Sequence, residues 1–198
     1  PDFMAVHMTS LSDTDIQLLA KHQTHVIHCP ESNLKLASGI CPTTALLANQ
    51  INVAIGTDGS ASNNDLDMLG EARTAALIAK GSTLQADSLP AKQALRMATI
   101  NGAKALGLDK KIGSLEVGKQ ADMFAINLDS IETQPVYDVI STLIYSASRS
   151  QISDVWVAGK RLMQDHKLIT IDESALIEKI KRWQGKINPF HHHPTKAV

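Results

Sequence analysis

The sequence predicts an α/β protein whose first half contains a parallel sheet, and three observations support this. Short apolar runs alternate with helical patterns along the first half of the chain. The connections between them are short, which favours parallel strands joined by right-handed crossovers. The apolar runs at 3–8, 24–29 and 51–55 end in polar or turn-forming residues, as strands that are buried on both faces do. Three such strands are too few to close a barrel by themselves.

The first strand, at 3–8, leads into a polar stretch at 9–13 that can cap a helix. The helical spacing of apolar residues begins at Ile16 and defines one buried face. The second strand, at 24–29, should end before Pro30 because proline cannot donate to a β ladder.

Helices are expected on both sides of the third strand. A short one is predicted at 43–49. Asn64 or Asp65 is expected to cap a longer helix that Gly81 ends. The residues at 88–90 should open another, since proline suits a first helical turn.

The composition changes near Gly113 and predicts a small β-rich unit. We expect a strand at 123–126 and, at 154–161, a strand that meets a turn before Leu162-Met163. The apolar, β-branched run at 139–145 belongs to the same unit. Asp172 is placed to cap a terminal helix with one apolar face and a cationic C-terminal end.

Charge and cysteine content narrow the classes of partner. The 198 residues include 19 basic and 20 acidic side chains, a net charge of -1, and show no block of like charge. We therefore expect neither nucleic acid nor an anionic membrane as a partner. Cys29 and Cys41 form no disulfide framework or zinc motif and are expected to be buried thiols in a reducing compartment. With no apolar run long enough for a bilayer, a cytoplasmic protein is expected.

Asp58 closes the third strand and is the first candidate for chemistry. In α/β sheets, reactive groups gather at the carboxyl ends of parallel strands. Asp58 is therefore a candidate metal ligand or proton acceptor. Taken alone, Asp58-Gly59 is more simply explained as a turn dipeptide.

Six motifs follow one another along nearly the whole chain. They are Ala5-Val6-His7, the His28-Cys29-Pro30-Glu31-Ser32-Asn33 stretch with Leu34-Lys35-Leu36, Gly56-Thr57-Asp58-Gly59 with Asn63-Asn64, Ala98-Thr99-Ile100-Asn101-Gly102-Ala103 with Leu106-Gly107-Leu108, Gly113-Ser114-Leu115 through to Ala121-Asp122, and Val155-Trp156-Val157-Ala158-Gly159-Lys160. In this order they resemble the amidohydrolase superfamily, in its aminohydrolase branch of nucleoside and base deaminases and triazine hydrolases.

The resemblance implies the C-terminal part of a (β/α)8 barrel that carries one divalent metal, usually zinc, with a small β-sandwich. By this mapping His7 ends barrel strand six, His28 lies on strand seven and Asp58 ends strand eight. The domains would be 1–111 for the barrel part, 112–171 for the sandwich contribution, and 172–198 for the terminal helix and tail.

The same resemblance implies that part of the site is missing. The His-x-His pair of strand one and the strand-five histidine with its glutamate are not in this sequence. The chain also opens at Pro1 inside a predicted strand, so we expect a piece of a longer protein that is inactive alone. Its expected partners are the N-terminal half of the barrel and further copies in a homo-oligomer.

Residue roles carried over from the family are as follows. Asp58 would be metal ligand, proton acceptor and substrate contact. His7 would hydrogen-bond the attacking water or the oxyanion that forms, although a buried histidine satisfied by the backbone is the commoner fate of a single histidine. For His28, a substrate contact and a supporting role behind the site are equally plausible.

The implied function is hydrolytic deamination of a purine nucleoside, such as methylthioadenosine or S-adenosylhomocysteine, with release of ammonia. The alternatives are a triazine or guanine hydrolase of the same superfamily and a non-catalytic, self-associating half-barrel fragment.

Two further groups of polar residues could be taken for binding sites, but each also has a structural explanation. Four side chains after Asp58 can meet a ribose or base, but turn and capping duties explain them equally well: Ser60, Ser62, Asn63 and Asn64. The run His191-His192-His193 is expected to belong to a flexible tail, because consecutive side chains point in different directions.

Overall fold

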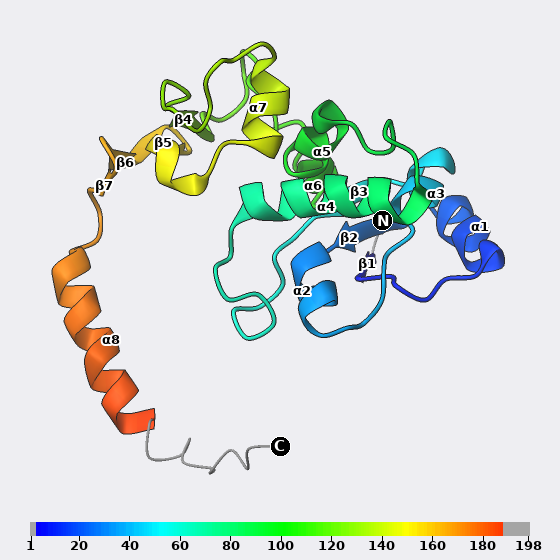
Figure 1. The fold of residues 1–198 in the computed structure, drawn as a ribbon, viewed down its shortest axis with the longest axis horizontal. Coiled ribbons are helices and arrows are strands. Elements are labelled where there is room, and N and C mark those ends of the chain that lie inside the picture. The colour runs from blue at the N-terminus through cyan, green and yellow to red at the C-terminus, as the bar shows by residue number, and fades with distance from the viewer. Residues whose placement is uncertain (1–2, 188–198) are drawn as a thin grey trace.

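The computed structural model describes residues 3–187, which form two sheets and their surrounding helices (Figure 1). The elements in chain order are β1 (Met4–Val6), α1 (Asp13–Lys21), β2 (His25–His28), α2 (Pro30–Lys35), α3 (Thr43–Ala48), β3 (Val53–Ile55), α4 (Met68–Thr83), α5 (Ala91–Met97), α6 (Ile100–Ala105), β4 (Met123–Ile126), α7 (Val139–Tyr145), a 3-10 turn (Arg149–Gln151), β5 (Ile152–Val157), β6 (Lys160–Gln164), β7 (Lys167–Leu168) and α8 (Glu173–Ile187). The run His191–His193 lies outside the described residues.

The first sheet is parallel, in the order β1-β2-β3, which confirms the α/β class. Ala5 pairs with Val26, and Val26 pairs with Val53. All three residues of β3 are buried, whereas Met4 and Val6 on β1 are exposed. Strand β1 is therefore an edge strand with apolar side chains open to solvent.

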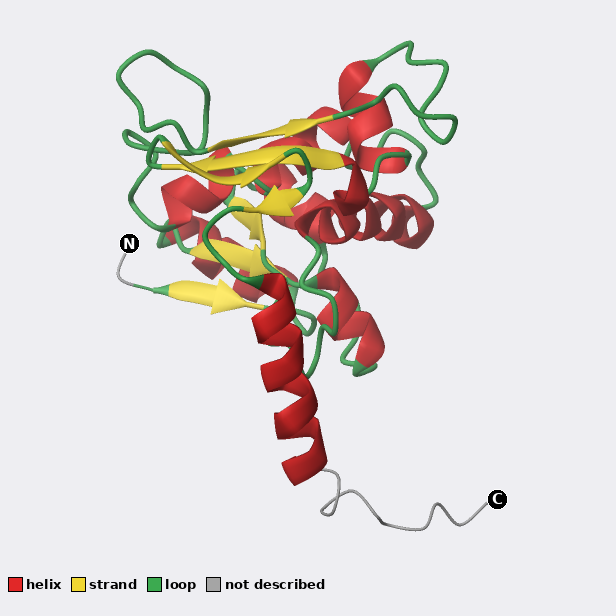
Figure 2. Ribbon diagram, turned by 90° about the vertical axis from the view of Figure 1, so that its left-hand side faces the viewer, coloured by secondary structure: helices red, strands yellow, loops and turns green. Residues whose placement is uncertain are grey.

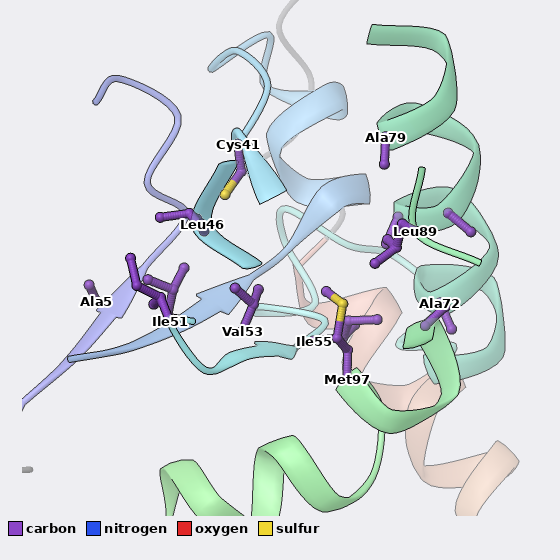
Figure 3. Close-up of a cluster of buried hydrophobic side chains, with 14 of the residues drawn as sticks. Ala5, Cys41, Leu46, Ile51, Val53, Ile55, Ala72, Ala79, Leu89 and Met97 are labelled. Atoms are coloured by element: carbon purple, nitrogen blue, oxygen red, sulfur yellow. The ribbon is translucent and has the colours of Figure 1, made fainter. Parts of the chain in front are cut away.

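The core lies between this sheet and helix α4. Figure 3 shows side chains of β3 and α5 meeting the alanine face of α4. That face consists of alanines with almost no exposure: Ala72, Ala75, Ala76 and Ala79. Side chains this small let a helix approach a sheet closely, so α4 packs tightly against the strands.

The capping predictions for the first and fourth helices have different outcomes. The predicted polar cap of α1 is confirmed, since Ser12 and Asp15 form a reciprocal capping box. The predicted start of α4 is wrong, because Asp67 caps it rather than Asn64 or Asp65. The Asn63 side-chain oxygen accepts a hydrogen bond from the backbone N–H of Leu66 at 2.7 Å, so the chain is still turning there. The helix also continues past Gly81 to Thr83.

The run 139–145 forms helix α7, so the prediction that it belongs to the β-rich unit is wrong. Asp138 caps α7 by accepting the backbone N–H of Ser141 at 2.6 Å. Ile144 is fully buried, and α7 packs against α4 and α5. Arg73 of α4 donates to the carbonyl of Ile144 at 2.9 Å. Tertiary packing and a cap thus override the β propensity of the branched side chains.

The second sheet is antiparallel, in the order β4-β5-β6-β7. The predicted strands at 123–126 and around 154–161 are confirmed, with a turn at Ala158-Gly159 between β5 and β6. Figure 2 shows this sheet as a layer separate from the parallel strands.

Helix α8 confirms the predicted terminal helix, and Asp172 accepts the backbone N–H of Ala175 at 3.0 Å. The helix extends away from both sheets (Figures 1 and 2), and none of its residues is buried. Its apolar side chains are exposed: Leu176, Ile177, Ile180, Trp183 and Ile187. In residues 3–187, no helix combines the length and hydropathy needed to cross a bilayer.

Candidate functional site

The candidate site lies at the carboxyl edge of the parallel sheet. His7 directly follows β1, His28 is the last residue of β2, and Asp58 follows β3. Because the strands are parallel, these ends meet at one edge. Ladder-like hydrogen bonds continue there, from His7 N to the Ile27 carbonyl and from Gly56 N to the His28 carbonyl, both at 2.9 Å.

His7 and Asp58 approach each other across this edge. The distance from His7 Nε2 to Asp58 Oδ2 is 3.8 Å, and the two side chains are 41% and 34% exposed. Both residues have positive φ, 70° for His7 and 63° for Asp58. Non-glycine residues seldom adopt this conformation, which costs energy. An imidazole and a carboxylate thus face solvent from strained positions.

The Asp58 carboxylate is held by two serine hydroxyls. Ser62 Oγ and Ser32 Oγ each donate to Asp58 Oδ2 at 2.7 Å. The hydrogen bond from Ser62, then that from Ser32, lowers the pKa of Asp58 to about 2. Asp58 is therefore anionic throughout the physiological range, as a cation ligand or a proton acceptor must be.

Helix α2, which the sequence did not predict, brings these supporting residues to the site. Pro30 ends β2 as expected and also begins this helix, a position that suits proline. Ser32 contacts Asp58, and its neighbour Asn33 contacts His7, with 2.8 Å between Asn33 Oδ1 and His7 Nδ1. Lys35 Nζ also donates to the carbonyl of Ala61 at 2.9 Å. One short helix thus contacts both sides of the site.

A buried carboxyl cluster lies next to these contacts. Glu71 on α4 is 0% exposed. Its carboxyl accepts hydrogen bonds from Asn63 Nδ2 at 2.6 Å and from the backbone N–H of Glu31 at 3.2 Å. Glu31 in turn accepts from Thr74 Oγ1 at 2.9 Å. Burial, reinforced by the nearby negative charge of Glu31, raises the pKa of Glu71 to about 7.

His28 lies beneath the site rather than at its surface. The residue is 2% exposed, and burial, with a contribution from His7, lowers its pKa to about 4. It is therefore neutral at physiological pH. Its Nδ1 has no hydrogen-bond partner among residues 3–187.

Three of the four polar residues predicted after Asp58 have structural partners. Ser62 bonds Asp58, Asn63 bonds Glu71, and the Asn64 side-chain oxygen accepts from Lys35 Nζ at 2.5 Å. Sequence reasoning missed the supporting residues Ser32, Asn33 and Glu71. The signal for Glu71 was available, because it has the helical spacing of the buried face that continues at Ala75 and Ala79.

The site offers a divalent metal one suitable ligand. Within residues 3–187, no group of three or more His, Cys, Asp or Glu side chains is placed to hold a metal ion. The ionised carboxylate of Asp58 fits one corner of such a site. A catalytic zinc requires about three protein ligands, so the remaining ligands would have to come from outside the described residues.

Comparison with known proteins identifies the family of this chain. The profile of the amidohydrolase family matches residues 1–162. Over 182 residues the chain is 50% identical to the 5-methylthioadenosine/S-adenosylhomocysteine deaminase of Teredinibacter turnerae, covering 92% of this chain and 41% of that protein. Over 181 residues it is 46% identical to the 5'-deoxyadenosine deaminase of Methanosarcina acetivorans, covering 91% of this chain and 41% of that protein.

A solved structure gives the same result. An adenosine deaminase from Xanthomonas campestris with bound zinc superimposes with a TM-score of 0.92 and 52% identity. The match covers 94% of this chain and 42% of that one. The chain therefore spans less than half the length of these relatives, and it belongs to the amidohydrolase family.

Proposed function

We propose that this chain is the C-terminal part of a metal-dependent amidohydrolase that removes the exocyclic amino group of a purine nucleoside. The observation that carries the proposal is the convergence of His7 and Asp58, 3.8 Å apart, at the carboxyl edge of a parallel sheet. The printed names of the relatives favour methylthioadenosine, S-adenosylhomocysteine or 5'-deoxyadenosine as substrate. We call the protein that contains this chain and the proposed preceding segment the intact protein.

Strands β1, β2 and β3 are proposed to be strands six, seven and eight of a (β/α)8 barrel. Their parallel order supports this, as does the exposure of Met4 and Val6 on the β1 edge. An edge strand with apolar side chains on a soluble enzyme calls for a neighbour. The preceding segment would supply that neighbour and the other metal ligands.

In the reaction, water replaces the amino group on a ring carbon, giving a carbonyl and ammonia. A bound zinc, with Asp58 among its ligands, would lower the pKa of water and so supply a nucleophile at neutral pH. Asp58 is anionic and can accept the proton that the attacking water loses. His7 is placed to hydrogen-bond that water.

The test compares the intact protein with the 198-residue chain. Each is supplied with zinc and assayed for ammonia release from methylthioadenosine, S-adenosylhomocysteine, 5'-deoxyadenosine, guanine and a triazine. We expect the intact protein to act on the nucleosides and the chain alone to be inactive. If the intact protein acts only on guanine or only on the triazine, it is a guanine or triazine hydrolase instead. Turnover by the isolated 198-residue chain would refute the need for a preceding segment.

A second candidate is a non-catalytic fragment that associates with itself. The exposed apolar face of α8 and the open β1 edge favour it. Intact-mass analysis combined with size-exclusion chromatography distinguishes the two. Oligomers built only from a 21.4 kDa chain would support self-association, whereas a longer polypeptide carrying a His-x-His motif would support the enzyme.

A further inference from the structure

The hydrogen bond between Asn33 and His7 fixes where the histidine carries its proton. Asn33 Oδ1 lies 2.8 Å from His7 Nδ1. An amide oxygen has no hydrogen and can only accept. With the Asn33 amide in this orientation, the proton of the bond is on His7 Nδ1, and in the neutral imidazole the lone pair is on Nε2.

That lone pair is on the nitrogen directed towards the other reactive side chain. His7 Nε2 is the atom that lies 3.8 Å from Asp58 Oδ2. A neutral histidine in this form can accept a hydrogen bond from a water or a substrate N–H between the two side chains. In the opposite tautomer, Nε2 would carry a hydrogen and could only donate.

We propose that Asn33 is a positioning residue that holds His7 in the Nδ1–H tautomer with Nε2 directed at the reacting atoms. The proposal rests on the function proposed above for His7. It assigns to Asn33 a role that acts through His7, without contact between Asn33 and the substrate.

The surroundings of Asn33 make it a rigid support. The residue is 3% exposed. Its backbone N–H donates to the Cys29 carbonyl at 3.0 Å, and its carbonyl accepts from Ser38 N at 2.9 Å. On the other side, the backbone N–H of His7 is held by Ile27. Both ends of the Asn33–His7 bond are thus anchored to the sheet and its adjoining helix.

The cost of burying this amide also points to a specific role. Asn33 Nδ2 has no hydrogen-bond partner among residues 3–187. A buried polar atom without a partner is destabilising, and an apolar side chain of similar size would avoid that cost. The bond to His7 is the compensating interaction that this side chain makes.

The test uses the intact protein with Asn33→Leu, which removes the acceptor, and Asn33→Asp, which keeps an acceptor oxygen. The matched controls are Asn52→Leu and Asn52→Asp. Asn52 lies just before β3, at the end of the strand opposite Asp58, where its Nδ2 donates to the Asn101 carbonyl at 3.0 Å.

The first measurement is the tautomer of His7, read from long-range 1H–15N correlation spectra and assigned through His7→Gln. We expect the Nδ1–H form in the wild type, in Asn33→Asp and in both controls, and a mixture of tautomers in Asn33→Leu. The second measurement is steady-state kinetics. Asn33→Leu should lower kcat by about ten- to a hundredfold with KM changed less than about twofold, and Asn33→Asp should recover part of that loss.

Three results would overturn the proposal: an Nε2–H wild-type histidine, an unchanged tautomer in Asn33→Leu, or an equal loss of kcat in Asn52→Leu. The spectra also separate this inference from the proposed function. An intact protein without deaminase activity whose tautomer shifts as expected would refute the function and support the role of Asn33. An active enzyme in which Asn33→Leu leaves the His7 tautomer unchanged would support the function and refute the role of Asn33.

Discussion

Glu71 accepts a 2.6 Å hydrogen bond from Asn63 and thereby ties helix α4 to the loop that carries Asp58. The other carboxyl oxygen of Glu71 accepts the backbone N–H of Glu31 at 3.2 Å, at the start of α2. One buried carboxyl therefore joins the two segments from which Ser32 and Ser62 reach Asp58.

This buried carboxyl should make the stability of the intact protein depend on pH. The pKa of Glu71 is raised from 4.5 to about 7 in the folded state. Between these values the folded state holds a proton that the unfolded chain releases, so stability is full below about pH 4.5 and falls as the pH rises to about 7. We expect a loss on the order of 3 kcal/mol across that window, measured as the free energy of urea unfolding at pH 5 and pH 8.

Glu71→Gln should remove most of this pH dependence, because the amide does not titrate. The control is Glu178→Gln, which neutralises an exposed glutamate paired with Lys181 and should keep the wild-type slope. An unaltered slope in Glu71→Gln would show that another group titrates in this range.

Asp58→Asn should abolish most of the activity of the intact protein. The amide keeps the shape of the side chain but loses the charge that binds a cation and accepts a proton. We expect kcat to fall by about 10² to 10⁴-fold, together with a lower zinc content measured by atomic emission. Asp65→Asn makes the same charge change in the same loop, on a residue 3.7 Å from Arg149. It should leave both quantities near wild type.

Ser62→Ala should raise the pKa of the Asp58 carboxyl in the zinc-free intact protein. The Ser62 hydroxyl is the main cause of the low pKa of Asp58, ahead of Ser32. Without it, the pKa of Asp58 rises back towards 3.8, and the carboxylate is protonated earlier as the pH falls. The carboxyl 13C chemical shift of Asp58, followed across an acid titration of the zinc-free protein, checks this. Ser60→Ala, which removes a neighbouring hydroxyl that makes no such bond to Asp58, should follow the wild-type curve.

Gly113→Ala should destabilise the protein through a steric clash. A Cβ at this position would lie 2.6 Å from Ala103 Cβ and 3.0 Å from Ile100 Cα, and the residue has a φ of +89°. We expect a loss of about 1–3 kcal/mol in the free energy of unfolding. Gly118 has a φ of +93° with no atom within 4 Å of an added Cβ. Gly118→Ala therefore reports the backbone strain alone, and equal losses in the two variants would rule out the clash.

Most of the regular elements could be predicted from the sequence, because their signals are local. The apolar runs gave the three parallel strands, and Ser12 and Asp172 marked the starts of α1 and α8. The run 139–145 shows where local signals fail. Its branched side chains favour a strand, but the cap at Asp138 and the burial of Ile144 against α4 and α5 make it a helix.

The candidate site divides in the same way. Asp58 stood out because it closes a predicted strand, and His7 because the family resemblance places it at the end of another, and strand ends converge in a parallel sheet. Their supports did not stand out, because Asn33 is 26 residues from His7 and Ser32 is 26 residues from Asp58. Pairings of this kind depend on how α2 folds over the edge of the sheet. The spacing of apolar residues along the sequence carries no information about that arrangement.

Ser32 and Asn33 are adjacent in the chain, yet each supports a different reactive side chain. This makes the segment 28–35 a unit for building chimeras between relatives. If the junction between the two parent sequences lies outside this segment, Ser32 and Asn33 come from the same parent, and so do the supports of Asp58 and His7. If the junction lies between Ser32 and Asn33, the two residues come from different parents. The two halves of α2 then need not fit each other, and the misfit would displace Asp58 relative to His7.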